Sequence, residues 1–419
     1  MSNHKIQPVR GTKDLFGNEI KFFNHIVSTA KKKSEVFGFE ELQTPIFEFS
    51  EVFERNLGEA SDIVAKEVYK FLDRGDNFLT LRPEFTACVV RALISNGELQ
   101  QILPRKFFSF GPLFRYERPQ KGRQRQFHQV NFEVIGEKNY FCDVETILLA
   151  SSILKDLGVL DKTVLQINSL GCDQTKLNYE AALKQYLAKF KNDLSHDSQI
   201  RLEKNPLRIL DSKDLQDIKL LENAPKISNF FSDEAKLRFD SILNLLTKFG
   251  VKHLVNQRLV RGLDYYTSTV FEFVMNHEGA QNTVLAGGRY DSLVEKMSGK
   301  KVPAIGFGAG IERLMLLASF ELEKKRPISI NYISQNEKSY AFEIAQSLRN
   351  AGFTTEFVFE GNFKKQMKRS SQIGSQFVVI VGENEVKNSE VAVKDFDNSS
   401  EQKISQNFLI NYLQEREKN

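Results

Sequence analysis

Two runs of alternating residues, joined by a basic loop, form the clearest pattern in the chain, at residues 107–136. Successive side chains of a β-strand point to opposite faces, so alternation predicts which residues share a face. In the second run the apolar and polar residues separate onto two faces, with Val130, Phe132 and Val134 against Gln129, Asn131 and Glu133. In the first run Phe108, Phe110 and Phe114 share one face, and Leu113 and Arg115 share the other. The pattern predicts a hairpin with a core face and a polar face, with Arg115 at a strand end.

The loop between these runs, residues 116–125, is basic and longer than the usual hairpin turn of about 2 to 5 residues. It contains Arg118, Lys121, Arg123 and Arg125 against one acid, Glu117. A charge run of this kind is often only a solvated loop. Alternatively, a guanidinium at a strand end beside a polar sheet face suits a zwitterion with a phosphate. The loop would then face a larger polyanion.

Further elements can be expected before this hairpin. Apolar residues at helical spacing predict a helix over 18–37, and Gly38 follows it as a candidate cap. The run 39–49 reads as a strand interrupted by Pro45, which favours the edge of a sheet or a subunit boundary. Residues 69–72 and 78–81 predict a short hairpin around a Gly, Asp and Asn turn.

The second half of the chain changes character twice. A lysine-rich, mostly helical segment at about 171–225 looks inserted between two halves of a sheet domain, and the charged stretch 321–327 is a candidate linker. Strands are expected at 270–274 and 304–310, with a helix at 311–321. Beyond the linker we expect strands at 328–333, 355–359, 376–382 and 390–396 and helices near 336–351, 363–372 and 405–416. That order predicts an α/β module with a mainly parallel sheet.

Composition narrows the class of protein. The 419 residues are 41% hydrophobic and 27% charged with a net charge of +4, which is typical of a globular protein and permits nucleic-acid binding without requiring it. Cys88, Cys142 and Cys172 are far apart, so neither a disulfide framework nor a zinc ribbon is expected. His128 shares parity with Val130 and is interpreted as a packed sheet residue. Without an apolar leader or a run of ~18 apolar residues, we expect a cytoplasmic protein that does not span a membrane.

Three more motifs mix glycine, charge and aromatic residues: LRPEFT at 81–86, LVRGLDYYTSTVFEF at 259–273, and AGGRYDSL with GFGAGIERL at 286–293 and 306–314. Glu84 and Thr86 suit the α-amino group of a ligand, and Arg261 precedes two tyrosines. Arg313 lies in the first turn of an expected helix, where phosphate is attracted. GFGAG matches no dinucleotide motif and could instead serve close helix-to-strand packing. Together the motifs could bind ATP, a small amino acid and a transition-state phosphate.

These strings resemble the histidyl-tRNA synthetase family of class II aminoacyl-tRNA synthetases, over essentially the whole chain. The resemblance rests on LRPE, GPLFRYERPQKGRQRQFHQ, LVRGLDYY, AGGRYD and GFGAGIERL. Phe85 replaces a usual glycine, and Tyr116 stands where histidine is common. The resemblance implies an α/β (α+β) fold, with an antiparallel-sheet catalytic core at 1–170 and 229–325, a helical insertion at 171–228, and an α/β anticodon-binding domain at 327–419.

The resemblance also implies a two-step ligation of L-histidine to tRNA(His) through histidyl-adenylate, releasing pyrophosphate and AMP. ATP would enter with Mg²⁺, and no protein-bound metal or prosthetic group is expected. Arg115 would hold the α-phosphate, Arg313 the γ-phosphate, and Arg261 would stabilise the developing charge. The implied histidine contacts are Glu84, Thr86, Gln129, Glu133, Arg261, Tyr265, Tyr266 and Tyr290. The implied ATP contacts are Arg115, Arg313 and Glu117, and the implied tRNA contacts are Gln120, Lys121 and Arg123.

A homodimer is expected through the first helix and the strand around Pro45, and the four cations at 361–370 could contact the anticodon or lie on a solvated helix face. One alternative is the regulatory subunit of ATP phosphoribosyltransferase, which resembles the synthetase core but binds histidine as an effector and lacks the anticodon module. Another is an RNA-binding or histidine-sensing module without catalysis. Arg115, Arg261, Arg313 and the module after Pro327 favour the synthetase.

Overall fold

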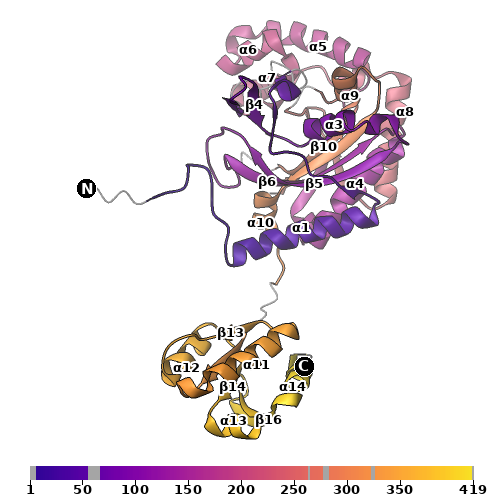
Figure 1. Cartoon of the computed structure of the whole chain (residues 1–419). Coiled ribbons are helices and arrows are strands. Elements are labelled where there is room, and N and C mark those ends of the chain that lie inside the picture. Colours follow the sequence, from indigo (N-terminus) through magenta and orange to yellow (C-terminus); the bar gives the residue numbers. More distant parts are fainter. Residues whose placement is uncertain (1–5, 55–66, 263–264, 277–282, 322–325, 418–419) are drawn as a thin grey trace, which may run out of the picture. The chain divides into compact units, whose positions relative to one another are not determined.

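The computed structural model describes residues 6–54, 67–262, 265–276, 283–321 and 326–417 (Figure 1). The chain forms two compact units, Met1–Glu321 and Leu322–Asn419. Most of the candidate linker lies outside the described residues, as do Leu263 and Asp264 of the LVRGLDYY motif. Among the described helices, none combines the length and the apolar composition that crossing a bilayer requires.

An eight-stranded sheet organises the first unit, in the order β1-β5-β6-β11-β10-β9-β7-β8. Its strands are β1 (Glu40–Glu41), β5 (Arg105–Phe114), β6 (Gln126–Ile135), β7 (Thr163–Ser169), β8 (His253–Val255), β9 (Thr269–Met275), β10 (Thr283–Arg289) and β11 (Ala304–Gly310). The inner pairings are antiparallel, and only the edge pairings β1–β5 and β7–β8 are parallel within the described part of the sheet. The predicted antiparallel core is therefore confirmed, as are the hairpin β5–β6 and the strands β9 and β11.

One face of this sheet is covered by α1 (Asn18–Val36), α4 (Tyr140–Asp156), α8 (Asp233–Lys248) and α10 (Ile311–Leu317) (Figure 1). The alternation of β6 was interpreted correctly, because Val130, Phe132 and Val134 are all buried in the core beneath these helices. The predicted first helix is confirmed as α1, which is followed by Gly38 in the left-handed region at φ 73°. Burying this face fixes the strand register, so the polar residues of β6 must point to the opposite face.

The opposite face is only partly covered. Helices α3 (Thr86–Ser95) and α9 (Asp291–Ser298) pack there over Phe107 and Ile135. The polar strand residues beyond them border a cavity. Helix α3 was not predicted, although it begins within the LRPEFT motif.

A small second sheet, in the order β2-β4-β3, contains β2 (Phe47–Phe49), β3 (Tyr69–Leu72) and β4 (Phe78–Leu81). The predicted hairpin is confirmed as β3–β4, with Asp76 at φ 60° in its turn. The run around Pro45 divides into β1, at the edge of the large sheet, and β2, at the edge of the small one. The sheet-edge interpretation of this run is confirmed.

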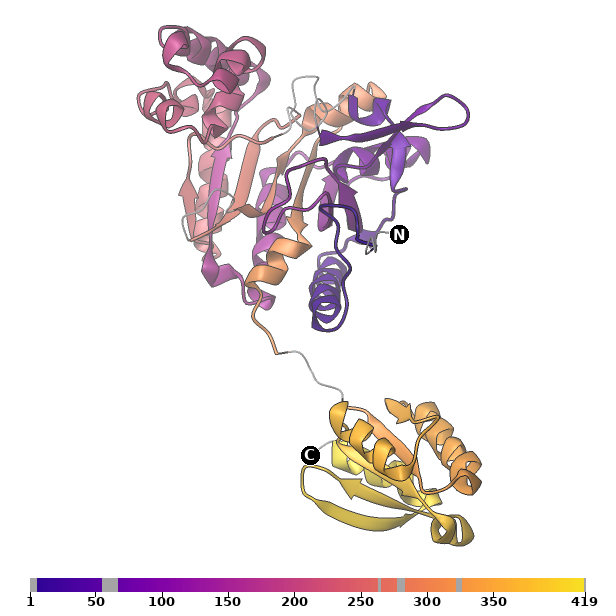
Figure 2. The ribbon, with the colours of Figure 1, turned by 90° about the vertical axis from the view of Figure 1, so that its left-hand side faces the viewer.

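The lysine-rich segment folds as α5 (Asp173–Ala188), α6 (His196–Lys204) and α7 (Leu215–Leu221), linked by short 3₁₀ turns. Buried Asp217 ties its loops together, because the carboxylate accepts hydrogen bonds from the hydroxyls of Ser195, Ser198 and Ser212 at 2.6–2.7 Å. Figure 2 shows these helices and the small sheet at opposite ends of the first unit. The limits of 171–228 as a separate domain stay a prediction.

The second unit holds a five-stranded sheet in the order β13-β12-β14-β15-β16. Its elements are β12 (Ile328–Tyr332), α11 (Lys338–Asn350), β13 (Thr355–Phe357), α12 (Phe363–Gln372), β14 (Phe377–Val381), α13 (Glu383–Asn388), β15 (Glu390–Asp395), β16 (Ser400–Ser405) and α14 (Leu409–Glu417). The α/β module is confirmed, but the mainly parallel sheet is wrong, because β14–β15 and β15–β16 are antiparallel. The short α13 returns the chain beside β14 without a crossover. β16 was not predicted because its sequence, SEQKIS, lacks an apolar alternation.

Candidate active site

A cavity of about 300 Å³ lies over the polar face of β6 and the neighbouring strands β10 and β11. Most of the predicted site residues line it, namely Glu84, Thr86, Arg115, Glu117, Arg123, Gln129, Arg261, Tyr265, Tyr266 and Arg313. A second cavity of about 770 Å³ shares Arg123, Arg261 and Arg313 with it and extends to Ser195 and Arg201 of the helical segment. Sequence positions separated by more than a hundred residues thus meet at one place.

The carboxyl group of Glu133 occupies the centre of a buried hydrogen-bond network. One oxygen accepts from Thr86 Oγ1 at 2.6 Å and from Asn131 Nδ2 at 2.8 Å, and the other accepts from the Tyr290 hydroxyl at 2.5 Å. Burial raises the pKa of Glu133 to about 8, although these hydrogen bonds act in the opposite direction. Each of these three donors is neutral, so the Glu133 carboxyl group is buried with hydrogen-bond partners but without a positively charged one.

Gly306 makes room for this carboxyl group. Gly306 pairs with Glu133 across β11–β6, and a Cβ atom there would lie 1.7 Å from Glu133 Oε2 and 2.5 Å from the Phe132 carbonyl oxygen. Gly308 lies on the same face, where a Cβ would approach Gln129 Oε1 to 3.0 Å. The glycines of GFGAG therefore form an open floor under the polar side chains, in addition to any role in packing.

Glu84 and Thr86 meet at the start of α3. Both oxygens of Glu84 accept backbone hydrogen bonds at 2.7 Å, from Thr86 N and Ala87 N. Burial raises the pKa of Glu84, while these backbone N–H groups and Arg115 oppose that rise. The Thr86 hydroxyl already donates to Glu133. The predicted contacts for an α-amino group thus border the cavity, with both side chains held by the protein.

Phe85 lies between these two residues but is buried beneath a guanidinium. The centre of the Arg82 guanidinium lies 4.4 Å from the Phe85 ring centroid. Arg82 is itself buried and donates to carbonyl oxygens of Thr44 and Pro112. The Phe85 ring is therefore part of the packing around Arg82 as well as part of the cavity wall.

Three tyrosines stand around the network. The ring centroids of Tyr265 and Tyr266 are 4.8 Å apart, and those of Tyr265 and Tyr290 are 5.7 Å apart. Burial raises the pKa of all three hydroxyl groups, so they stay protonated and can donate hydrogen bonds. Tyr265 and Tyr266 line the cavity, whereas Tyr290 and Glu133 are not among its lining residues and connect to it through Thr86 and Tyr265.

The other part of the cavity is cationic. Arg115 Nε donates to the Pro83 carbonyl at 2.9 Å, and Arg261 Nη1 pairs with Glu272 at 2.9 Å. Arg313 donates to the carbonyl oxygens of Gly122 at 3.2 Å and Thr283 at 2.5 Å. Burial lowers the pKa of Arg313, and its arginine neighbours lower it further. Crowded cations of this kind suit a bound polyanion.

The basic loop is folded back on itself. Gln120 and Arg123 form a β-bridge, and Arg123 Nε lies 2.6 Å from Glu117 Oε2. Arg123 and Glu117 both line the cavity, whereas Lys121 lines a separate apolar pocket beside α1. The structure thus places Lys121 in a different pocket from Arg123 and Glu117, and Gln120 lines neither of these two pockets.

Sequence reasoning left several residues of this region unassigned. They are Asn131, Phe127, Arg289, Gly306 and Glu272. Arg289 belongs to a motif that was singled out, but its partner Asp143 lies 146 positions away. His128 was interpreted correctly, since it packs edge-on against Phe23 and its Nδ1 lies 2.8 Å from Glu312. The described residues contain no cluster of three or more His, Cys, Asp or Glu side chains suited to a metal ion.

Comparisons with known proteins agree over the length of the chain. The family model described as histidyl-tRNA synthetase matches residues 11–314, and that described as anticodon binding domain matches residues 327–416. Histidine–tRNA ligase of Wolbachia pipientis subsp. Culex pipiens is 49% identical over 96% of this chain and 98% of the relative. That of Orientia tsutsugamushi (strain Ikeda) is 46% identical over 98% of each. The crystal structure of apo Staphylococcus aureus histidyl-tRNA synthetase superposes with a TM-score of 0.82 at 31% identity, covering 97% of this chain and 99% of that one. The chain belongs to the histidyl-tRNA synthetase family and carries an anticodon-binding domain.

Proposed function

We propose that this chain ligates L-histidine to tRNA(His) in two steps. The carboxylate of histidine attacks the α-phosphorus of ATP to form histidyl-adenylate and pyrophosphate. A hydroxyl of the terminal adenosine of the tRNA then attacks the histidyl carbonyl, and AMP leaves. The observation that carries the proposal is one cavity in which Thr86, Tyr265 and Tyr266 adjoin a cluster of arginines, with the Glu133 carboxyl group hydrogen-bonded to the Thr86 hydroxyl.

Glu133 would select histidine. A ring N–H of the imidazole would donate to the Glu133 carboxyl group, and the tyrosines would enclose the ring. An amino acid without such a donor would leave a buried carboxyl group without its ligand partner, which is worth far more discrimination than a difference in apolar size. Glu84, Thr86 and Gln129 would lie near the charged head of the amino acid.

The arginines would hold and activate the phosphates. Arg115 would contact the α-phosphate, Arg313 the γ-phosphate, and Arg261 the reacting centre between carboxylate and phosphorus. These groups would act by orientation and charge, because the reaction requires no covalent intermediate with the protein.

ATP would enter as its Mg²⁺ complex. Glu117 and Glu312 line the cavity beside the arginines, and carboxylate oxygens of this kind fit Mg²⁺. The bound ion would offset the charge of the phosphates. Glu117 also pairs with Arg123, so these two side chains would adjust together when ATP binds.

The tRNA would contact the basic loop and the second unit. Gln120 and Arg123 would meet bases of the acceptor end, and Lys121 a phosphate. On α12, Lys364, Lys365, Lys368 and Arg369 offer cations to the anticodon stem, although Arg369 already pairs with Glu356. A cytoplasmic location follows from this role in translation.

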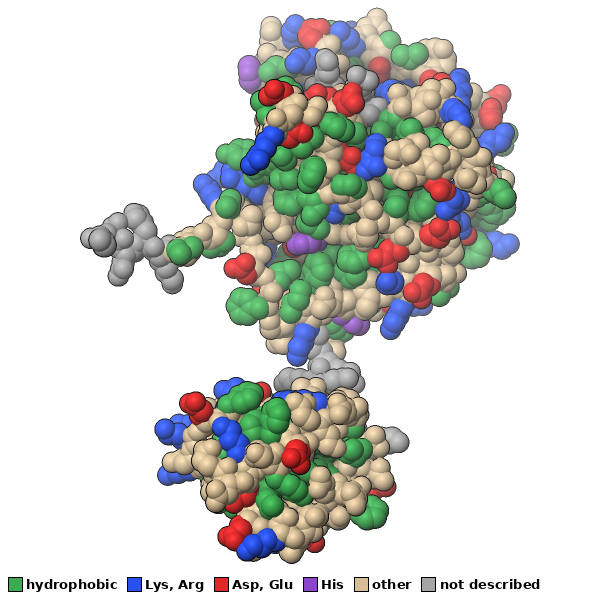
Figure 3. Space-filling view, viewed as in Figure 1, with side chains coloured by type: hydrophobic (Ala, Val, Ile, Leu, Met, Phe, Trp, Pro, Cys, Tyr) green, Lys and Arg blue, Asp and Glu red, His purple; other side chains and the backbone are tan. Residues whose placement is uncertain are grey.

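We also propose a homodimer that buries the apolar face of the small sheet. Phe47 pairs with Leu81 and Phe49 with Leu79, while Phe71 also pairs with Leu79, so these side chains share one face. Phe47, Phe49 and Phe71 are 52%, 54% and 43% exposed. Figure 3 shows hydrophobic side chains gathered on the upper half of the first unit, where Figure 1 labels β4 and α3. A contiguous exposed apolar face of this kind favours an interface with a second copy.

Phe49→Glu should convert a dimer to a monomer in light scattering, and a monomeric unmodified chain would refute the dimer.

ATP–pyrophosphate exchange with each amino acid tests the proposed activity. We expect exchange with histidine only, and no exchange, or equal exchange with another amino acid, would overturn it. Arg261→Ala should reduce exchange by on the order of 10² to 10³ while histidine binding changes by less than about threefold. Arg258→Ala, an exposed arginine three positions earlier, is the matched control and should retain full exchange.

A further inference from the structure

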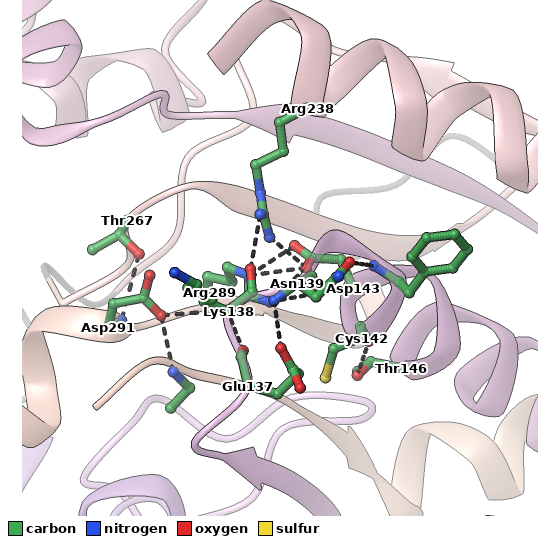
Figure 4. Close-up of polar contacts among 12 residues, drawn as sticks. Glu137, Lys138, Asn139, Cys142, Asp143, Thr146, Arg238, Thr267, Arg289 and Asp291 are labelled. Atoms are coloured by element: carbon green, nitrogen blue, oxygen red, sulfur yellow. Dashed lines mark hydrogen bonds and ion pairs between the residues drawn. The ribbon is translucent and has the colours of Figure 1, made fainter. Parts of the chain in front are cut away.

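A buried polar cluster behind the proposed histidine pocket has no role in the mechanism above. It comprises Arg289 at the end of β10, Asp143 on α4 and Arg238 on α8 (Figure 4). Asp143 is fully buried and the Arg289 side chain is 1% exposed. We call these three residues the Arg289 clamp.

The Arg289 guanidinium donates hydrogen bonds to a carboxylate and to backbone carbonyl groups. Its Nε and Nη2 donate to the Asp143 carboxylate at 2.7–3.0 Å. Its Nη1 donates to the Glu137 carbonyl at 2.9 Å, and Nη2 also reaches the Asn139 carbonyl at 3.1 Å. Figure 4 shows the guanidinium held between the start of α4 and the loop that precedes it. A planar guanidinium with this many fixed donors defines its own orientation.

Arg238 completes the clamp from a third element. Its Nη2 donates to Asp143 at 2.8 Å and its Nη1 donates to the Lys138 carbonyl at 2.8 Å. Loop 137–139 is therefore held by both arginines. This loop directly follows β6, the strand that carries Glu133.

The other side of the clamp leads to Tyr290. Tyr290 follows Arg289 in the chain, and its hydroxyl donates to Glu133 at 2.5 Å. The backbone on either side is fixed, since Tyr290 N donates to the Ala304 carbonyl at 2.9 Å and Thr267 N donates to the Arg289 carbonyl at 2.8 Å. The clamp thus joins the segments that carry the two partners of this hydrogen bond.

Stability alone is a weak explanation for this arrangement. Buried ion pairs are often no more stabilising than apolar residues of the same volume, because removing charges from water costs several kcal/mol per ion. A directional clamp instead fixes the placement of the neighbouring groups, and errors of about 1 Å in a binding site can cost on the order of 10²-fold in rate. The Arg289 clamp adjoins the two segments that place Glu133 and Tyr290, the residues of the proposed imidazole contact.

We propose that Arg289 is a positioning residue for histidine selection, acting through Tyr290 on Glu133 without touching the substrate. The inference rests on the proposed function, in which Glu133 receives the imidazole. The affinity for histidine should depend on the clamp, and the affinity for ATP should not.

A double-mutant cycle on histidine binding tests this role. By calorimetry, Arg289→Lys should weaken histidine binding by about 10- to 100-fold and change ATP binding by less than about twofold. In a Tyr290→Phe background the same substitution should change histidine binding by less than about threefold, because the group it positions is gone. An independent effect in that background, or equal losses for histidine and ATP, would overturn the inference.

Two further variants keep the test decisive. If Arg289→Lys does not fold, the same cycle with Asp143→Asn, which keeps the shape of the side chain, applies the same criteria. Arg105→Lys is the matched control, since Arg105 is a partly buried arginine paired with Glu40 and Glu98 in the same unit, and histidine affinity should stay unchanged. If the unmodified chain binds histidine but shows no ATP–pyrophosphate exchange, the proposed ligase function is refuted, while the double-mutant cycle can still be measured. If the unmodified chain does not bind histidine, both the proposed function and the role of Arg289 are overturned.

Discussion

Two fully buried carboxyl groups, ten positions apart in the chain, have opposite surroundings. Glu133 is hydrogen-bonded only to neutral donors, from Thr86, Asn131 and Tyr290. Asp143 is bound by two guanidinium groups, from Arg238 and Arg289. One site is a polar group buried without a counter-charge, and the other is a closed ion-pair cluster.

This difference separates recognition from architecture. The ionised form of a buried carboxyl group with only neutral partners is still stabilised by an added cation or strong hydrogen-bond donor, which a ligand can supply. A carboxylate already bound by two arginines needs no further cation, and its removal takes the closest counter-charge from the buried Arg289. The same chemical group therefore serves a ligand in one place and holds the backbone in the other.

The largest expected effect comes from replacing the carboxyl group at the recognition site. Glu133→Gln should lower kcat/KM for histidine by on the order of 10³-fold, because the buried acceptor that faces the imidazole becomes an amide. Exchange kinetics measure this. Glu145→Gln, an exposed acid on α4 paired with Lys106, should leave the kinetics unchanged. Comparable kinetics for Glu133→Gln and the unmodified chain would show that Glu133 does not select the substrate.

The next effect concerns stability at the closed cluster. Asp143→Ala should lower the free energy of unfolding of the first unit by about 3–5 kcal/mol, since the buried Arg289 loses its closest counter-charge and keeps only Asp291, at 3.6 Å. Urea denaturation followed by circular dichroism measures it. Asp156→Ala on the same helix breaks an exposed pair with Lys33 and should cost less than about 1 kcal/mol. Equal costs would mean that burial of the Asp143 pair is immaterial.

The space under Glu133 can be filled directly. Gly306→Ala should destabilise the first unit by about 1–3 kcal/mol through overpacking, because a Cβ would meet both a carboxyl oxygen and a backbone carbonyl. Gly310→Ala is the control, with its nearest neighbour, Arg313, at 3.8 Å. Thermal unfolding of both variants decides the point, and a Gly306→Ala protein as stable as the control would disprove the steric argument.

The last effect is a dependence of stability on pH. The pKa of Glu133 rises from 4.5 to about 8 on folding, so the folded state binds more protons between these values. The stabilising contribution is fully present below pH 4.5 and is lost as the pH rises to about 8, with a slope of at most about 1.4 kcal/mol per pH unit. The unfolding free energy of Glu133→Gln minus that of the unmodified chain should therefore increase from pH 6 to pH 8. A difference that decreases with pH would reverse the sign of the pKa shift.

The comparison also shows what the sequence could predict. The recognition face of β6 was predicted because strand parity is a local property, and Val130, Phe132 and Val134 mark the opposite face. The clamp could not be predicted, because Arg289 and Asp143 meet only in the folded protein and each alone resembles an ordinary charged residue. Glu84 was predicted as a site residue, but the hydrogen bonds of its oxygens to the start of α3 were not, because local patterns did not reveal that helix.

Strand β10 was missed for a different reason. Its glycine- and alanine-containing sequence, TVLAGGR, lacks the run of large β-branched and aromatic residues that signals a strand. At Gly287 the lack of a side chain is required by the neighbouring strand β11, since a Cβ there would lie 2.3 Å from the Gly306 carbonyl oxygen. Close strand packing thus removed the pattern by which a strand is recognised.

The strand order of the large sheet has a consequence for how the protein is made. Strands β1, β5 and β6 form one piece and β7 and β8 another, and only β9, β10 and β11 join them. During synthesis the strands up to β8, which ends at Val255, therefore keep two sheet edges unpaired until β11, which ends at Gly310, has left the ribosome. The second unit instead forms its sheet from contacts within fewer than a hundred residues, so loop closure delays it less. The strands that complete the ligand cavity are the last strands of the first unit to be translated, and we expect a nascent chain cut off before β9 to be captured by chaperones rather than to fold.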